Sequence, residues 1–212
     1  MALIHDAQLS PSKIDMLRAW APEQPWAAHL DITDVTILGA YRFDDPNGAV
    51  GMETFLLASG GEVLQVPLTY RDRPLADAQG HLVNTMQHSV LGERWVYDAV
   101  HDPVYVTVLA ATILTGGTQA ELQYDYPTSP EKRTVTTSVR GSGHEGTPVP
   151  PLLHVHVANS EGRTTFRSEA LEVTLARVVG VPLAPSPDAT LTGIWPGQDT
   201  PALLATARAV QV

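Results

Sequence analysis

Short runs of β-branched and aromatic residues, each ended by turn-forming residues, recur along most of this chain and constrain its fold more than any other feature. The first runs occupy residues 30–43, 51–58 and 62–70, and residues 44–48 (DDPNG) and 59–61 (SGG) separate them. Proline presets φ and Asn-Gly accepts positive φ, so both separators suit tight hairpins. The first half of the chain is therefore predicted to contain an antiparallel meander.

The same pattern continues towards the C-terminus, where turns separate one strand-like run from the next. These runs cover residues 81–90, 94–97, 119–124, 133–140, 152–158, 163–166 and 171–179. Strands that follow strands, with few helices between them, indicate an α+β fold with mostly antiparallel β-sheet. We expect a few helices, a β-rich and barrel-like second half, and two subdomains, 1–122 and 123–212, packed as one unit.

Three segments interrupt the strand pattern with helix signals. Asp102-Pro103 forms an N-cap and N1 pair before the apolar run 104–114, and Gly116 follows as a stop signal. This run also contains β-branched residues that suit a strand, but its caps and length favour a buried helix.

The other two helices are predicted near the ends of the chain. Ser10 is the expected N-cap of the first, with Pro11 at N1 and an end near Pro22. Thr200-Pro201 is expected to cap a short C-terminal helix over residues 202–210.

Charge and composition exclude several classes of function. The chain has 212 residues, a formal net charge of −10 and no cysteine. An acidic chain repels phosphate backbones and anionic lipid, so we expect no nucleic-acid or membrane partner. The longest apolar run is far shorter than the roughly 20 residues of a membrane span, and no secretory signal is apparent. We therefore expect a cytoplasmic protein without disulfides or a thiolate nucleophile.

Two motifs carry weak signals for bound groups. Residues 141–146 (GSGHEG) match the G-x-G-x-x-G pattern of dinucleotide-binding proteins, but the prolines at 148, 150 and 151 exclude the helix that this function needs. The segment 141–151 is instead predicted to be a mobile loop or a subdomain boundary. His154 and His156 lie in a predicted strand and would share one face, but a metal needs a third ligand. We expect no metal and no cofactor.

Aromatic residues beside amide and acid groups supply the candidate ligand-binding set, because such a combination can stack on a sugar and hydrogen-bond it. The alternative is that these aromatics anchor the core while the neighbouring acids hold Arg94 or cap a helix. The candidates are Arg94, Trp95, Tyr97, Asp98, His101, Trp195 and Gln198. Glu53, Glu62, Asp98 and Asp102 could pair for acid/base chemistry, although solvated surface charge is the default for carboxylates. No catalytic residue is assigned.

Residues 91–106 (LGERWVYDAVHDPVYV), continuing to 115–122 (TGGTQAEL), resemble the N-terminal cap region of actinobacterial maltokinases and related sugar kinases. Residues 61–70 (GEVLQVPLTY) are similar to the strand of that region that leads to a Val-Pro-Leu segment. In those kinases a later lobe supplies the nucleotide, metal and catalytic residues, and no position of this sequence matches its active-site motif. The resemblance implies a stand-alone cap-like protein without that lobe.

The resemblance further implies an auxiliary or regulatory role in maltose, trehalose or α-glucan (glycogen) metabolism. The implied partner is a sugar-metabolic enzyme or a carbohydrate ligand. Two other readings stay open at this point: a small enzyme acting on a sugar or sugar phosphate, and a structural protein that forms homo-oligomers.

Overall fold

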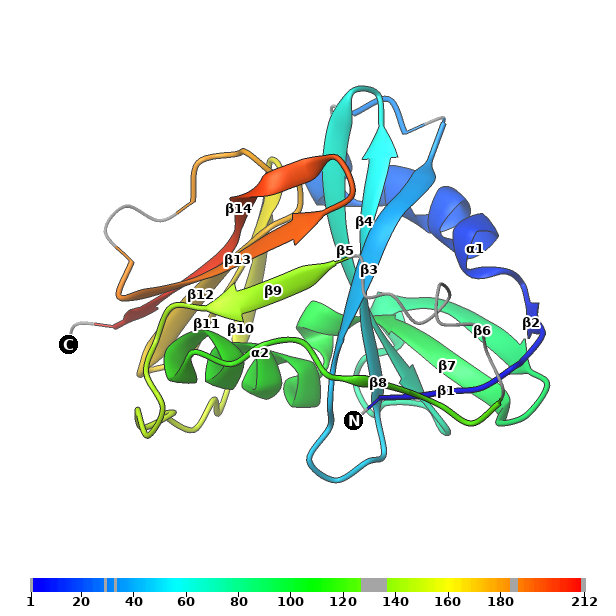
Figure 1. The fold of residues 1–212 in the computed structure, drawn as a ribbon, viewed down its shortest axis with the longest axis horizontal. Helices are drawn as coiled ribbons and strands as arrows, with labels where there is room; N and C mark the ends of the chain where they lie inside the picture. The colour runs from blue at the N-terminus through cyan, green and yellow to red at the C-terminus, as the bar shows by residue number, and fades with distance from the viewer. Residues whose placement is uncertain (1, 29, 33, 127–136, 184–186, 211–212) are drawn as a thin grey trace.

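Two six-stranded antiparallel sheets with two α-helices make up most of the protein (Figure 1). The structure is a computed structural model that describes residues 2–28, 30–32, 34–126, 137–183 and 187–210. This architecture confirms the predicted α+β class with mostly antiparallel sheet. Of the predicted strand 133–140, residues 133–136 lie outside the described residues.

The first sheet contains the predicted meander, formed by its three strands over residues 36–43, 51–59 and 62–71. Its strands are β2 (Leu9–Ser10), β3 (Thr36–Phe43), β4 (Gly51–Ser59), β5 (Glu62–Arg71), β6 (Leu82–His88) and β7 (Gly92–Asp98). Their order is β2-β6-β7-β5-β4-β3. The loop after β3 is shaped by Asp45, whose carboxylate accepts hydrogen bonds from the backbone N–H groups of residues 47, 49 and 50.

The second sheet has the order β10-β11-β12-β14-β13-β9, with every pair antiparallel. Its strands are β9 (Ser138–Gly141), β10 (His156–Ser160), β11 (Arg163–Arg167), β12 (Leu171–Ala176), β13 (Ala189–Trp195) and β14 (Gln198–Ala209). A separate parallel pair joins β1 (Ala2–Ile4) to β8 (Leu122–Tyr124).

Helices cover both faces of the first sheet. Helix α1 (Lys13–Trp20), with the short 3₁₀ helices η1 (Ala21–Glu23) and η2 (Pro25–Ala27), buries Met16, Leu17 and Trp26 against one face. The long helix α2 (Pro103–Thr115) lies along the second sheet, and together they enclose a core with the opposite face of the first sheet (Figure 1). In the described part of the chain, no helix combines the length and apolar character needed to cross a bilayer.

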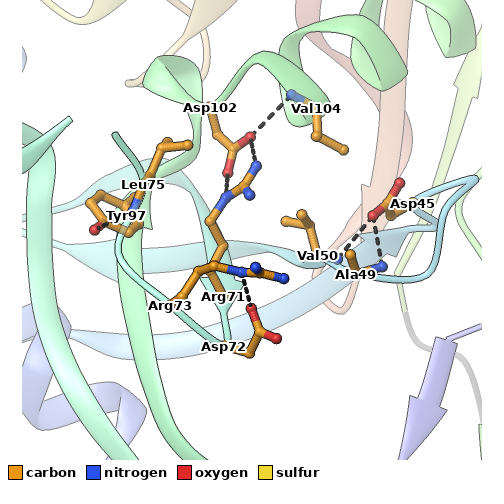
Figure 2. A network of polar contacts seen from close by, with 10 residues as sticks. All are labelled: Asp45, Ala49, Val50, Arg71, Asp72, Arg73, Leu75, Tyr97, Asp102 and Val104. Carbon is orange, nitrogen blue, oxygen red and sulfur yellow. Dashed lines mark hydrogen bonds and ion pairs between the residues drawn. The ribbon is translucent and has the colours of Figure 1, made fainter. Parts of the chain in front are cut away.

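The N-terminus of α2 is held by the cap that the sequence predicts. Asp102 is fully buried, and its side chain accepts a hydrogen bond of 3.0 Å from the backbone N–H of Val104. The same carboxylate receives two bonds of 2.7 Å from the guanidinium of Arg71 at the end of β5 (Figure 2). A buried anion at a helix N-terminus is stabilised by the helix dipole, so this ion pair joins helix and sheet.

The C-terminus of α2 explains the G-x-G-x-x-G motif. Gly116 ends the helix with φ of +72°, and the backbone N–H groups of Gly143 and His144 donate to the carbonyls of Ile113 and Leu114. These bonds satisfy carbonyls that the helix end leaves without partners. The segment 141–144 is thus a packed capping loop, and no helix follows it.

A buried polar contact fastens the two sheets together. Arg177, just after β12, has no exposed surface and donates bonds of 2.8 and 2.7 Å to the two carboxylate oxygens of Asp98 at the end of β7. The Arg177 guanidinium also lies 5.1 Å from the ring centroid of Trp26. Gln65 of β5 adds bonds of 2.8 and 3.0 Å to the carbonyls of Ala176 and Leu204.

The predicted C-terminal helix over residues 202–210 is wrong, because residues 202–209 belong to the long strand β14. Helix propensity is a weak local preference, and here pairing on both sides with β12 and β13 overrides it. Ala205 and Ala207 lie in the core beside α2, where small side chains let the helix approach the sheet. Pro201, which suggested a helix start, falls within an irregular stretch of the pairing between β13 and β14.

The predicted start of the first helix is also displaced. Ser12, not Ser10, is the N-cap of α1, and its hydroxyl accepts a hydrogen bond from the backbone N–H of Asp15. Ser10 pairs with Gln87 in the first sheet, so its backbone already serves as an edge strand.

The Arg177–Asp98 pair is expected to dominate stability. Replacing Arg177→Met leaves a buried carboxylate without its partner and should lower the free energy of unfolding by about 3–5 kcal/mol. Urea denaturation followed by circular dichroism measures this loss. The control is Arg73→Gln, which removes an exposed ion pair with Asp72 and should cost less than about 1 kcal/mol. Equal losses in the two variants would contradict this assignment.

Gly143 is expected to tolerate no side chain. A Cβ at this position would lie 1.9 Å from the carbonyl oxygen of Leu114, which is backbone and cannot swing away. Gly143→Ala should therefore lower the free energy of unfolding by about 1–3 kcal/mol. Gly80→Ala is the matched control, since a Cβ there meets nothing within 4 Å. Thermal unfolding of both variants tests the difference, and a wild-type midpoint for Gly143→Ala would refute the packing argument.

Candidate functional site

An N-terminal strap, residues 2–10, crosses one end of the first sheet. The strap pairs with β8 through β1 and with β6 through β2. His5 and Asp125 form a short ion pair that ties the strap to the residue after β8. Beneath the strap lies a cavity of about 600 Å³, here called the strap cavity. Its walls come from residues 4–9 of the strap, Lys13, the β3–β4 region 42–53, Tyr70, Asp72, and the β6–β7 region 86–94.

A buried carboxylate forms part of the wall. Glu53 of β4 receives a bond of 2.5 Å from Lys13 Nζ, at the start of α1, and bonds of 3.0 and 3.3 Å from the guanidinium of Arg42. The hydroxyl of Tyr70 lies 3.4 Å from the same carboxylate. Alternation along β4 brings Glu53 to the face covered by α1, where Phe55 and Leu57 belong to the core.

The electrostatics of Glu53 follow from these contacts. Burial alone would raise the pKa of this carboxyl, but Lys13 and Arg42 outweigh it and lower the pKa from 4.5 to about 2. Burial raises the pKa of Tyr70, and the neighbouring Glu53 raises it further. At neutral pH the cluster therefore contains two cations, one carboxylate and a protonated tyrosine hydroxyl.

A second group of donors lies on the β6–β7 wall. Arg94 of β7 donates to the carbonyl of Leu91, and its Nε is buried without a hydrogen-bond partner in the described residues. The Nδ1 of His88 accepts the backbone N–H groups of Val90 and Leu91, which places the ring proton on Nε2 in the neutral form. Burial lowers the pKa of His88, and His5, Arg94 and Lys13 lower it further, so the ring is neutral at pH 7.

The cavity has an acidic side at the hairpin. Asp45 uses its carboxylate to hold the β3–β4 loop, and Asp72 pairs with Arg73 at 3.2 Å (Figure 2). The part of the lining formed by Lys13, Arg42, His88 and Arg94 is here called the strap side; it includes the carboxylate of Glu53, while Asp44, Asp45 and Asp72 supply the other acids of the lining.

The candidate ligand-binding residues are not assembled into one cluster. Arg94 lines the strap cavity, and its neighbour Trp95 is half-buried on β7. Tyr97 is buried, and its hydroxyl accepts a bond of 3.0 Å from the backbone N–H of Leu75 (Figure 2). Asp98 is committed to Arg177, so it does not hold Arg94.

His101 lies in the 3₁₀ helix η4 (Ala99–His101), next to Asp102. Its ring stacks on that of His81 with 3.3 Å between centroids. Burial lowers the pKa of His101 to about 4, although Asp98 acts in the opposite direction. His101 is therefore a neutral ring at pH 7.

Trp195 and Gln198 lie on the second sheet. Trp195 is buried in the core beside Gly39, where it acts as the packing anchor that the alternative interpretation describes. Gln198 pairs with Trp195 across the β13–β14 turn, and its side chain donates to the carbonyl of Thr200. A sugar-binding role for these residues stays a prediction.

The carboxylates considered for acid/base chemistry do not pair with one another. Glu53, Asp98 and Asp102 are buried and each is held by arginine or lysine, while Glu62 is exposed at the β4–β5 turn. The default of solvated surface charge is thus wrong for three of the four. Buried charge is costly unless it is paired, which explains why a cation accompanies each one.

Metal ligation has no support in the described residues, where no three side chains of His, Cys, Asp or Glu gather in a ligand-like cluster. The predicted His154–His156 strand pair is also wrong, because β10 begins at His156 and His154 precedes it with φ of +50°.

Sequence reasoning missed the strap cavity, although two signals pointed to it. Glu53 is an acid within the otherwise apolar run of β4, which indicates a buried charge with a partner. Lys13 is one of only two lysines, the other being Lys132. The partner could not be found from sequence, because Lys13 and Glu53 are 40 residues apart.

Comparison with known protein families finds one region of the chain that matches a family. Residues 20–102 match the maltokinase N-terminal cap domain. This region of the chain is therefore similar to a maltokinase N-terminal cap domain, and it includes β3 to β7 of the first sheet. No curated protein matches the chain.

Glu53 makes stability depend on pH. Its pKa in the folded protein, about 2, lies below the ordinary value of 4.5, so its contribution is present above pH 4.5 and disappears as the pH falls towards 2. Glu53→Gln should lower the free energy of unfolding at pH 7 by about 2–3 kcal/mol, and the difference from wild type should shrink through that range. Urea midpoints at several pH values measure it.

The matched control is Glu62→Gln, which alters an exposed carboxylate at the β4–β5 turn. It should leave the pH profile of the wild type unchanged. A Glu53→Gln profile that runs parallel to wild type down to low pH would contradict the buried ion pair.

Proposed function

We propose that this protein is a non-catalytic, cap-like binding module with an auxiliary or regulatory role in maltose, trehalose or α-glucan metabolism. The observation that carries the proposal is the match of residues 20–102 to the maltokinase N-terminal cap domain. The module binds a sugar-metabolic enzyme or a carbohydrate-related ligand and acts in the cytoplasm.

The strap cavity supports a binding role. Its volume falls in the usual range of small-molecule sites, about 300–1,000 Å³. Its walls combine hydrogen-bonding groups such as His88 and Tyr70 with apolar groups such as Phe43 and Met86. This mixture suits a polar ligand with a carbon skeleton.

The buried carboxylates also fit binding and structure better than proton transfer. Asp98 and Asp102 hold the sheets and α2 in place, and the pKa of Glu53 is about 2, which keeps this group ionised near neutral pH. A general acid or base works best with a pKa near the working pH.

Two assays test this function. Purified protein should bind maltose, trehalose or a longer α-glucan by calorimetry, or should capture a sugar-metabolic enzyme from lysate of its native host. It should not phosphorylate or cleave these sugars when ATP and magnesium are added. Turnover by the purified protein would overturn the proposal, and so would failure of both binding assays.

A further inference from the structure

We propose that the strap side of the cavity binds the oxyanion group, phosphate or carboxylate, of a small ligand. This inference rests on the proposed binding role of the strap cavity and specifies the chemistry of its occupant. The geometry that supports it is the convergence of Lys13, Arg42, Arg94 and His88 on one cavity.

Lys13, Arg42 and Arg94 carry more charge than the one carboxylate bonded within their group, that of Glu53, although Asp44, Asp45 and Asp72 also line the cavity. Lys13 and Arg42 share a single carboxylate, that of Glu53, so their cluster retains one net positive charge. Arg94 adds another, because its hydrogen bond in the described residues goes to a neutral carbonyl. This surplus belongs to the group around Glu53 and Arg94 and not to the whole cavity lining or to the chain, which carries a net charge of −10. An anion is the ligand class that such a surplus stabilises.

A hydrogen-bond donor of this group also has no acceptor in the described residues. The Nε of Arg94 is buried and has no hydrogen-bond partner in the described residues. A buried N–H without an acceptor costs free energy, so the hydrogen bonds of Arg94 are not completed within the described residues. His88 is fixed with its proton on Nε2 because Nδ1 already accepts two backbone N–H groups, so it contributes a neutral donor.

The other carboxylates of the lining limit how the ligand can lie. Asp44, Asp45 and Asp72 repel an anion, so the oxyanion lies against Lys13, Arg42 and Arg94. The remaining part of the ligand then lies towards Tyr70, an aromatic ring with a protonated hydroxyl. A small polar molecule with one anionic end fits this arrangement.

Calorimetry with four probes tests the inference: inorganic phosphate, glucose 6-phosphate, glucuronate and glucose. At least one of the three anionic probes should bind, and glucose should bind at least tenfold more weakly than its anionic derivatives. Whether glucose 6-phosphate or glucuronate binds more tightly distinguishes a phosphate site from a carboxylate site.

Three variants locate the binding. Arg94→Gln should lower the affinity of the protein for the anion at least tenfold. Arg94→Lys should retain most of that affinity because it keeps the positive charge. Arg167→Gln makes the same change in net charge on the second sheet, where Arg167 is exposed and pairs with Glu172, and should bind as wild type does. Unfolding midpoints confirm that each variant is folded.

Two results would overturn the inference without touching the proposed function. One is glucose or maltose binding as tightly as the anions, with Arg94→Gln unaffected. The other is failure of every anionic probe to bind while a sugar-metabolic enzyme is captured from lysate. Equal loss of anion binding in Arg94→Gln and Arg167→Gln would also overturn it, because net charge and not the cavity would then control affinity.

Discussion

The ion pair between Arg177 and Asp98 is the contact on which the arrangement of the two sheets depends. It joins the end of β12 to the end of β7, and Arg177 is flanked by Trp26 and by Thr164, whose hydroxyl accepts a bond of 2.8 Å from its Nε. A guanidinium without exposed surface requires a carboxylate partner in a fixed geometry. The two sheets can therefore share one core only in the orientation that brings these residues together.

Local signals were sufficient where a segment is specified by its own residues. The caps of α2 at Asp102 and Gly116, and the turns around Asp45 and Gly60, depend on groups a few residues apart. Local signals failed where pairing with strands distant in the sequence decides the structure. Residues 202–209 have good helix propensity, yet their backbone groups form hydrogen bonds with the two neighbouring strands, β12 and β13.

The candidate site also combines residues that local sequence signals indicate with residues that they do not. Arg94 was found because it lies in a conspicuous aromatic segment, but its partners in the cavity come from the strap, α1 and the β3–β4 region. Lys13 and the strap precede residue 20, where the match to the cap domain begins. The cavity is thus built jointly by the region that matches the cap domain and by a segment outside the match.

The packing of the loop 141–144 on the end of helix α2 also constrains the length of the helix. Gly141 and Gly143 lie so close to the carbonyls of Thr112 and Leu114 that the loop follows the last helical turn. Each residue added to a helix rotates its end by about 100° and extends it by about 1.5 Å. An insertion in α2 would turn these carbonyls away from the loop, so the number of residues in the helix is set by a strand of the second sheet.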